Sequence, residues 1–264
     1  NVQFAIKNDQ ICIIEVNPRA SRTVPFVAKA TDSAIASIAA RVMAGEKLNS
    51  FKKRESYGSV SYGETIPLAD PMSLASPMLP WFSVKEAVMP FARFPGVDTI
   101  LGPEMRSTGE VMGWDRDFGR AFLKAQIGAG MKLPRKGCVF FSIKDKDKND
   151  NLAETAQRLI KLGFNIIATR GTSAFLKEKN IPCKQVNKVY EGRPNIVDTM
   201  KNGEIDLVMN TTEGLQAVKD SREIRSVALY DKIPYFTTAA AAHAAALAIQ
   251  SQNEGDIEVK SLQN

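Results

Sequence analysis

The chain has 264 residues, of which 44% are hydrophobic and 24% are charged, and its formal net charge is +6 at pH 7. This composition is typical of a soluble globular protein, and the length allows two domains, each with its own core. The positive charge allows anionic ligands such as nucleotides. However, the basic residues are scattered without interleaved aromatics and no apolar run is long enough to cross a bilayer, so neither nucleic-acid binding nor membrane insertion is expected.

The first stretch, residues 2–17, predicts a β-hairpin whose two strands flank a turn at 8–10. Side chains alternate along a strand, so Glu15 and Asn17 point to the same face, and the pairing can set Gln3 beside them. Three oxygen ligands on one face of a rigid sheet suit a hard cation such as Mg²⁺, which completes its shell with water and substrate phosphate. The alternative is an ordinary antiparallel hairpin with a polar outer face.

Two arginines, Arg19 and Arg22, come directly after this strand. A guanidinium offers forked, permanently charged donors that match the oxygens of a phosphate. The two side chains are therefore predicted to clamp the phosphate that a bound cation would bring.

Between the hairpin and the second half, the sequence predicts two helices, one strand, a tight loop and a long surface segment. They are a helix at 31–44 that ends at Gly45, a surface segment at 46–80, a strand at 82–91, a tight loop at 102–110 and a helix at 115–126. Glycines and a proline at 128–134 then indicate an interdomain linker. The predicted domains are therefore residues 1–130 and residues 131–264.

The second half alternates strands with helices. Strands are predicted at 137–143, 164–168, 182–186, 207–210 and 234–237. Helices are predicted at 150–162, 172–179, 195–202, 214–230 and 238–250. Such alternation favours an α/β fold with a parallel sheet that helices cover on both faces.

Polar residues gather where several of these strands end. Ligands of parallel sheets bind beyond the carboxyl ends of the strands, where helix N termini offer free N–H groups. The residues predicted to line a phosphate pocket there are Ser142, Lys148, Thr169, Thr172, Lys188, Asn210, Thr211 and Thr212. Each threonine cluster alone is also compatible with ordinary helix capping, and the convergence of three strand ends with lysines favours the phosphate site.

Two runs, Glu15–Val27 and Phe94–Gly113, resemble the carbamoyl phosphate synthase large subunit family. The first run is similar to the metal-binding end of the second ATP-grasp synthetase half, an α+β domain. The resemblance implies a Mg²⁺ or Mn²⁺ ion that bridges the phosphates of the substrate ATP. The implied metal ligands are Gln3, Glu15 and Asn17, with Gln3 and Glu15 also at the ATP, and the implied catalytic residues are Arg19 and Arg22.

The second half resembles the methylglyoxal synthase-like regulatory domain of the same family, which has a Rossmann-like fold with a parallel sheet. This implies that the eight residues at the strand ends bind nucleotide effectors, an inhibitory pyrimidine monophosphate such as UMP or an activating purine one such as IMP. The residues implied in activation by ornithine are Glu86, Tyr235 and Thr237. Phe236 stands where the family has an aspartate.

The family resemblance implies an ATP-dependent ligase that phosphorylates carbamate to carbamoyl phosphate for pyrimidine and arginine biosynthesis. It also implies a glutaminase small subunit as partner and an oligomeric full enzyme. The chain opens inside a strand without a methionine, so we expect a fragment that is inactive by itself.

The cysteines, Cys12, Cys138 and Cys183, are odd in number and far apart, and they are expected to be buried, reduced thiols of a cytoplasmic protein.

Two rival functions remain open. One is a non-catalytic module that senses nucleotides. The other is a lyase similar to methylglyoxal synthase, which needs a carboxylate and histidines in its pocket. Against the lyase, Arg193 stands where the acid is expected, and His243, the sole histidine, lies in an alanine-rich helix.

Overall fold

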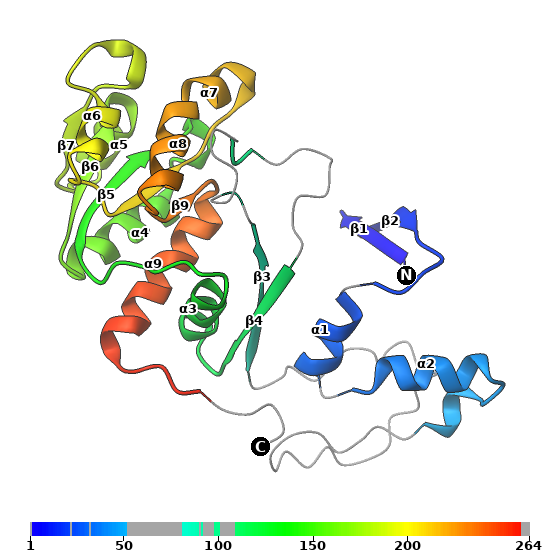
Figure 1. Ribbon diagram of the computed structural model, residues 1–264. Helices are drawn as coiled ribbons and strands as arrows, with labels where there is room; N and C mark the ends of the chain where they lie inside the picture. Colours follow the sequence, from blue (N-terminus) through cyan, green and yellow to red (C-terminus); the bar gives the residue numbers. More distant parts are fainter. Residues whose placement is uncertain are drawn as a thin grey trace. The chain divides into compact units, whose positions relative to one another are not determined.

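Figure 1 shows the computed structural model of the chain, which describes residues 2–21, 23–31, 33–51, 81–89, 91, 98–100 and 109–259. The chain divides into two compact units, residues 1–80 with 258–264, and residues 81–257. The domain boundary predicted at residue 130 stays a prediction. Most of the predicted surface segment at 46–80 and of the predicted loop at 102–110 lies outside the described residues.

The first unit begins with an antiparallel hairpin of β1 (Val2–Lys7) and β2 (Gln10–Val16), as the sequence predicts. The turn residues Asn8 and Asp9 both have positive φ angles, 49° and 61°. Short polar side chains tolerate this left-handed conformation, and a two-residue turn of this kind matches the twist of the strands that it joins. The turn thereby fixes the register of the hairpin.

Both faces of this hairpin are exposed. All residues of β1 and β2 are solvent-exposed, because none of the described residues covers either face. Cys12 on β2 is therefore exposed, and the expectation that it is buried is wrong. Cys138 and Cys183, which lie in the second unit, are half-buried.

Two helices and one short helical turn follow the hairpin. They are α1 (Thr23–Ala30), α2 (Ile35–Met43) and a 3₁₀ turn at Leu48–Ser50. The helix predicted at 31–44 corresponds to α2, and the chain reverses after it at Gly45, whose φ of 101° favours glycine. The sequence pattern does not predict α1, whose first turn contains Pro25, a position at which helices tolerate proline.

The second unit starts with an antiparallel pair, β3 (Phe82–Val88) and β4 (Gly109–Asp115), against which α3 (Phe118–Gly128) packs. The sequence predicts β3 and α3 but no strand at β4. Gly113 explains how closely α3 approaches, because a Cβ there would overlap the carbonyl oxygen of Ala121. Figure 1 shows α3 between this pair and the long helix α9, with which it makes extensive contact.

The rest of the second unit is a five-stranded parallel sheet in the order β7-β6-β5-β8-β9. Its strands are β5 (Gly137–Ser142), β6 (Phe164–Thr169), β7 (Lys184–Val186), β8 (Leu207–Asn210) and β9 (Tyr235–Phe236). Its helices are α4 (Asp150–Lys161), α5 (Arg170–Glu178), α6 (Ile196–Lys201), α7 (Gly214–Asp220), α8 (Arg222–Tyr230) and α9 (Ala239–Glu254), with 3₁₀ turns at Asp145–Asp147 and Val189–Glu191. The predicted α/β fold is confirmed.

One predicted helix, at 214–230, is two helices in the structure. The break falls at Ser221, between α7 and α8. The Ser221 hydroxyl donates a 2.8 Å hydrogen bond to the carbonyl oxygen of Ala217, one turn back. Serine side chains that bond to the preceding turn compete with the helical ladder and bend helices, which accounts for the interruption.

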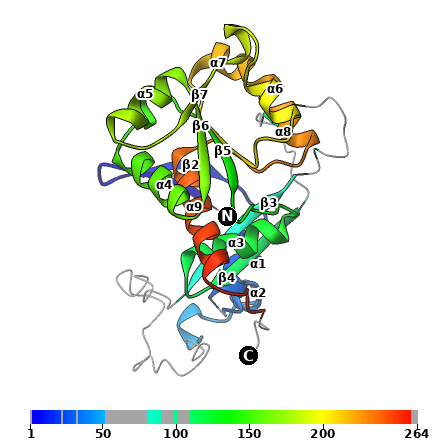
Figure 2. The ribbon, with the colours of Figure 1, turned by 90° about the vertical axis from the view of Figure 1, so that its left-hand side faces the viewer.

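Helices cover both faces of the sheet, as predicted. In Figure 2, α4 and α5 lie on one side of the strands and α6 and α8 on the other. Adjacent residues of β5 point to opposite sides: Val139 and Phe141 belong to the core under α4 and α9, and Phe140 to the core under α6 and α8. All three are fully buried. A strand with apolar residues on both faces requires cover on both.

Candidate functional site

The three predicted cation ligands lie together on the hairpin. The register of β1 and β2 pairs Gln3 with Glu15. The Glu15 carboxylate oxygen Oε1 accepts hydrogen bonds from Gln3 Nε2 and from Asn17 Nδ2, each 2.7 Å long. The two amides therefore converge on one carboxylate oxygen, in an arrangement open to solvent.

These three side chains fit a hard cation by their chemistry. Each amide carries a carbonyl oxygen that becomes a ligand when the group turns over, and a carboxylate and amide oxygens are ligands that Mg²⁺ accepts. Among the described residues, no group of three His, Cys, Asp or Glu side chains could hold a metal ion. The Gln3–Glu15–Asn17 cluster, with one carboxylate and two amides, is a candidate cation site because of the oxygens that it offers.

The arginines predicted to clamp a phosphate follow the cluster. Arg19 donates a 3.3 Å hydrogen bond from Nη1 to the carbonyl oxygen of Ala20, its neighbour in sequence, and its residue is exposed. Arg22 lies outside the described residues. The role of both arginines at a phosphate stays a prediction.

The polar residues predicted at the strand ends meet at one edge of the parallel sheet. Ser142, Thr169 and Asn210 are the last residues of β5, β6 and β8, and the register places Ser142 directly beside Asn210. The N–H of Thr211 donates to the carbonyl oxygen of Ser142 over 2.9 Å, and its hydroxyl accepts from the N–H of Lys144, also over 2.9 Å. These side chains hold the loops of the edge together.

Thr172 in the first turn of α5 is part of the same framework. Its hydroxyl oxygen accepts a 3.0 Å hydrogen bond from the N–H of Ile143 and one of 3.3 Å from the hydroxyl of Thr169. Thr169 is the N-cap of α5 but makes no side-chain cap hydrogen bond. The N–H groups of the first turn of α5 therefore receive no side-chain cap from Thr169, and such groups favour an anion.

Lysines surround this edge, and carboxylates of the same loops pair with them. Lys148 Nζ lies 2.6 Å from Asp145 Oδ1, and Lys146 Nζ lies 2.5 Å from Glu213 Oε1. The side chain of Lys148 is 15% exposed and that of Asp145 is 95% exposed. The hydrogen bond from Lys148, and then its charge, lower the pKa of Asp145, and the charge of Lys188 adds to this shift.

The residues implied in ornithine binding lie in different surroundings. The Tyr235 hydroxyl accepts a 2.6 Å hydrogen bond from Asn210 Nδ2, and burial raises its pKa. The Glu86 carboxylate accepts a 2.9 Å hydrogen bond from the buried amide of Gln126, and burial raises its pKa also. Thr237 follows β9 and is exposed. Tyr235 thus joins the predicted nucleotide edge through Asn210.

Several residues of this region are not predicted from the sequence. Asp145 is not among the predicted site residues because a carboxylate is not expected beside a phosphate. The alternation of lysine and aspartate at 144–148 in the sequence is the signal that could have indicated it. Arg225 forms a bidentate pair with Asp98, with two contacts of 2.7 Å. The two residues are 127 positions apart in the sequence, so no local sequence pattern predicts this pair.

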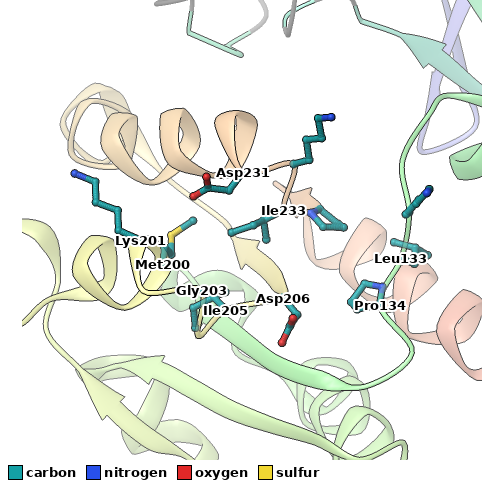
Figure 3. Close-up of a pocket in the computed structure, with 12 residues that line it drawn as sticks. Leu133, Pro134, Met200, Lys201, Gly203, Ile205, Asp206, Asp231 and Ile233 are labelled. Atoms are coloured by element: carbon teal, nitrogen blue, oxygen red, sulfur yellow. The ribbon is translucent and has the colours of Figure 1, made fainter.

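A cavity of about 450 Å³ lies at the opposite, amino edge of the sheet. Figure 3 shows its lining, which includes Asp206 before β8, Ile233 before β9 and Pro134 before β5. Its lining mixes lysines and aspartates with apolar residues. None of the predicted site residues lines it, so this cavity is separate from both candidate sites.

The two residues that bear on the lyase alternative both have structural partners. His243 Nδ1 on α9 lies 3.0 Å from the hydroxyl oxygen of Thr155 on α4, where the two helices pack together. Arg193 lies 3.8 Å from the carboxylate of Asp198. His243 therefore contacts a neighbouring helix and Arg193 a carboxylate, and neither contact supports the lyase.

Comparisons with known proteins match two separate regions of the chain to domain families. Residues 1–51 match the family model "Carbamoyl-phosphate synthase L chain, ATP binding domain", and residues 151–237 match the "MGS-like domain". The carbamoyl phosphate synthase large chain of Brucella suis is 51% identical over 264 residues, which covers all of this chain. This chain is homologous to the carbamoyl phosphate synthase large chain along its whole length. The large chains of Pasteurella multocida and Archaeoglobus fulgidus are 50% and 45% identical.

The homologous region is only part of those proteins. The chain spans 21% of the length of the Brucella suis large chain and 23% of the Archaeoglobus fulgidus one. Within the described residues, no helix has both the length and the apolar character that crossing a membrane requires. The similarity covers the hairpin, the β3–β4 pair and the parallel sheet together.

Proposed function

We propose that the chain supplies the cation-binding strand and the nucleotide-sensing domain of an ATP-dependent ligase that phosphorylates carbamate to carbamoyl phosphate. The observation that carries the proposal is the Gln3–Glu15–Asn17 cluster, in which two amides converge on one carboxylate oxygen. The match of residues 1–51 to an ATP binding domain supports ATP as the substrate. In the full enzyme, a glutaminase small subunit would be the partner of this large chain, within a cytoplasmic oligomer that feeds pyrimidine and arginine biosynthesis.

In this proposal, Gln3, Glu15 and Asn17 hold a Mg²⁺ or Mn²⁺ ion through one carboxylate and two amide oxygens. When bound, such an ion neutralises charge on the phosphate oxygens of ATP. Glu15 supplies the negative charge, and the amides of Gln3 and Asn17, which contact its carboxylate in this structure, turn over to supply the other two oxygens. Arg19 and Arg22 donate hydrogen bonds to the phosphate oxygens and stabilise the charge that develops during transfer.

A chimera tests the proposal. We would replace the matching fifth of the Brucella suis large chain with this chain and measure the formation of carbamoyl phosphate from ATP and carbamate. The chimera should be active, and Glu15→Gln should lower kcat on the order of 100-fold. The matched control is Glu46→Gln in the same unit, because Glu46 pairs with Arg41 away from the cluster and its loss should leave kcat unchanged. A folded chimera without activity refutes the proposal.

We also propose that the second unit binds a nucleoside monophosphate, UMP or IMP, at the carboxyl edge of its sheet. The binding residues would be Ser142, Lys148, Thr169, Thr172, Lys188, Asn210, Thr211 and Thr212. Support comes from the shared sheet edge, from the lysines around it and from the uncapped first turn of α5. An ornithine site that includes Glu86, Tyr235 and Thr237 would lie next to it, since Tyr235 bonds to Asn210.

Calorimetric titration of the chain with UMP and IMP tests this second part. Lys148→Ala should weaken binding at least about tenfold, because a charge-assisted hydrogen bond to phosphate is lost. The control is Lys179→Ala, which removes an ammonium from the far end of α5 where its partner is the exposed Asp150. If neither nucleotide binds to the wild-type chain, the regulatory assignment is refuted, whereas the hairpin assignment is untouched.

A further inference from the structure

Cations and carboxylates alternate in the loop that follows β5. The residues are Lys144, Asp145, Lys146, Asp147 and Lys148. Each lysine of this run has a carboxylate partner at the same sheet edge: Lys144 pairs with Asp147 at 3.7 Å, and the other two pair with Glu213 and Asp145 as described above. The loop that is proposed to receive a phosphate thus neutralises its own positive charges.

Lys148 is the lysine of this run that the protein holds most firmly. Its side chain is 15% exposed, compared with 75% for Lys146. Its Nζ lies over the first turn of α5. A Cβ added to Gly171, in that turn, would be 3.1 Å from this Nζ. The ammonium group therefore lies beside a helix N terminus whose N-cap residue gives it no side-chain cap.

Asp145 reaches this ammonium from the solvent. Its side chain is 95% exposed and contacts Lys148 at 2.6 Å, from the first residue of the 3₁₀ turn that Lys148 follows. The Asp145 carboxylate contacts Lys148, and the charge of Lys188 adds to the lowering of its pKa, so both lysines proposed for the effector act on this carboxylate. A carboxylate in that position presents two oxygens to the groups that would otherwise contact a phosphate.

We propose that Asp145 is an internal competitor for the effector phosphate. Its carboxylate occupies the phosphate-binding side of Lys148 in the free protein and must swing out before a nucleoside monophosphate can bind. The inference rests on the proposed regulatory function and deepens it, because it assigns to Asp145 the control of effector affinity. An exposed ion pair contributes little to stability, so the displacement leaves the fold unchanged and appears only as weaker binding.

The competing charge has a calculable effect. At about 6 Å in water, one negative charge repels each charge of a phosphate by somewhat more than the thermal energy, and a phosphate monoester carries close to two charges. Asp145→Asn should therefore tighten the binding of UMP or IMP about five- to tenfold. Glu213→Gln should tighten it less, about twofold, because its partner Lys146 is largely exposed.

The experiment is a calorimetric titration of the full 264-residue chain and its variants with UMP and IMP at one fixed salt concentration. The matched control is Asp150→Asn, which removes the same charge from another exposed pair, with Lys179 at 2.7 Å. The control should change the dissociation constant less than twofold. Circular dichroism and the melting temperature of each variant check that the fold is retained.

The outcomes separate the two claims. Tighter binding by Asp145→Asn, with an unchanged control, supports the inference. Binding that is unchanged or weaker in Asp145→Asn while the wild type binds overturns the inference alone, since Asp145 then at most orients Lys148. Absence of binding in the wild type and in every variant overturns the proposed regulatory function and the inference with it.

Discussion

The buried pair of Arg225 and Asp98 offers the sharpest prediction for stability. Arg225 is 6% exposed, and its guanidinium donates to both carboxylate oxygens of Asp98 and to the carbonyl oxygen of Val218, with distances of 2.7, 2.7 and 2.9 Å. Asp98→Ala would leave this guanidinium buried without its carboxylate partner. Breaking such a pair from one side costs about 3–5 kcal/mol. Because the Asp98 side chain is 25% exposed, we lower this to about 2–3 kcal/mol.

Tryptophan fluorescence measures this loss. The chain has two tryptophans, Trp81 and Trp114, which both belong to the second unit and whose ring centroids lie 5.4 Å apart. Their emission during urea unfolding therefore reports on the unit that contains the pair. A change of about 2–3 kcal/mol corresponds to roughly 5–10 °C in melting temperature for a unit of this size. The control Glu154→Ala removes an exposed partner of Arg158 and should cost under about 0.5 kcal/mol.

Low pH should remove the stabilisation that the Arg225–Asp98 pair contributes. Hydrogen bonds from Arg225, and then its charge, hold the pKa of Asp98 below its usual range. A carboxyl whose pKa is lower in the folded state stabilises the fold above its unfolded pKa, and the contribution is lost as the pH falls through the folded pKa. The wild type should thus lose stability below about pH 4 more steeply than Asp98→Ala. A loss under about 1 kcal/mol in the variant at pH 7 would refute the reasoning.

Three further predictions concern single sites. Gly119→Ala should cost about 1–3 kcal/mol in urea unfolding, because the new Cβ would come 2.7 Å from a carbonyl oxygen of α9. Gly171→Ala should weaken UMP or IMP binding in calorimetry but leave the melting temperature within about 2 °C, since the new Cβ would meet the Nζ end of the Lys148 side chain and no backbone atom. Ellman's reagent at pH 8 should modify the exposed Cys12 rapidly and Cys138 slowly, because burial raises the pKa of Cys138 to about 11, and Cys12→Ser should remove the rapid phase.

Local patterns in the sequence predict the hairpin and the parallel sheet because the forces that form them are local. The turn at Asn8 and Asp9 and the alternation along β5 are both readable from neighbouring residues. The strand β4 escapes prediction because its defining feature is Gly113, whose role appears only when α3 packs on it. A glycine inside a strand otherwise argues for a loop or bulge.

The candidate site, like the fold, is predicted from the sequence only in part. The position of Ser142 and Asn210 at one sheet edge follows from the rule that parallel strands end together. The pairing of Lys146 with Glu213 spans 67 residues and depends on the order β5-β8 in the sheet, which the sequence pattern leaves open. Sequence therefore predicts which residues reach the edge, while the structure gives the partners that each of them finds there.

Those partners change which substitution can test the effector site. Thr172 is 1% exposed, and its hydroxyl oxygen accepts the N–H of Ile143 at 3.0 Å. Thr172→Val preserves the shape but leaves that buried N–H without its acceptor, at a cost of about 1–3 kcal/mol. We therefore expect Thr172→Val to lower stability in urea unfolding as well as effector binding, whereas Lys148→Ala should lower binding with stability nearly unchanged. If Thr172→Val unfolds at the same urea concentration as the wild type, its hydroxyl is not part of the framework of the sheet edge, and its role is confined to the ligand.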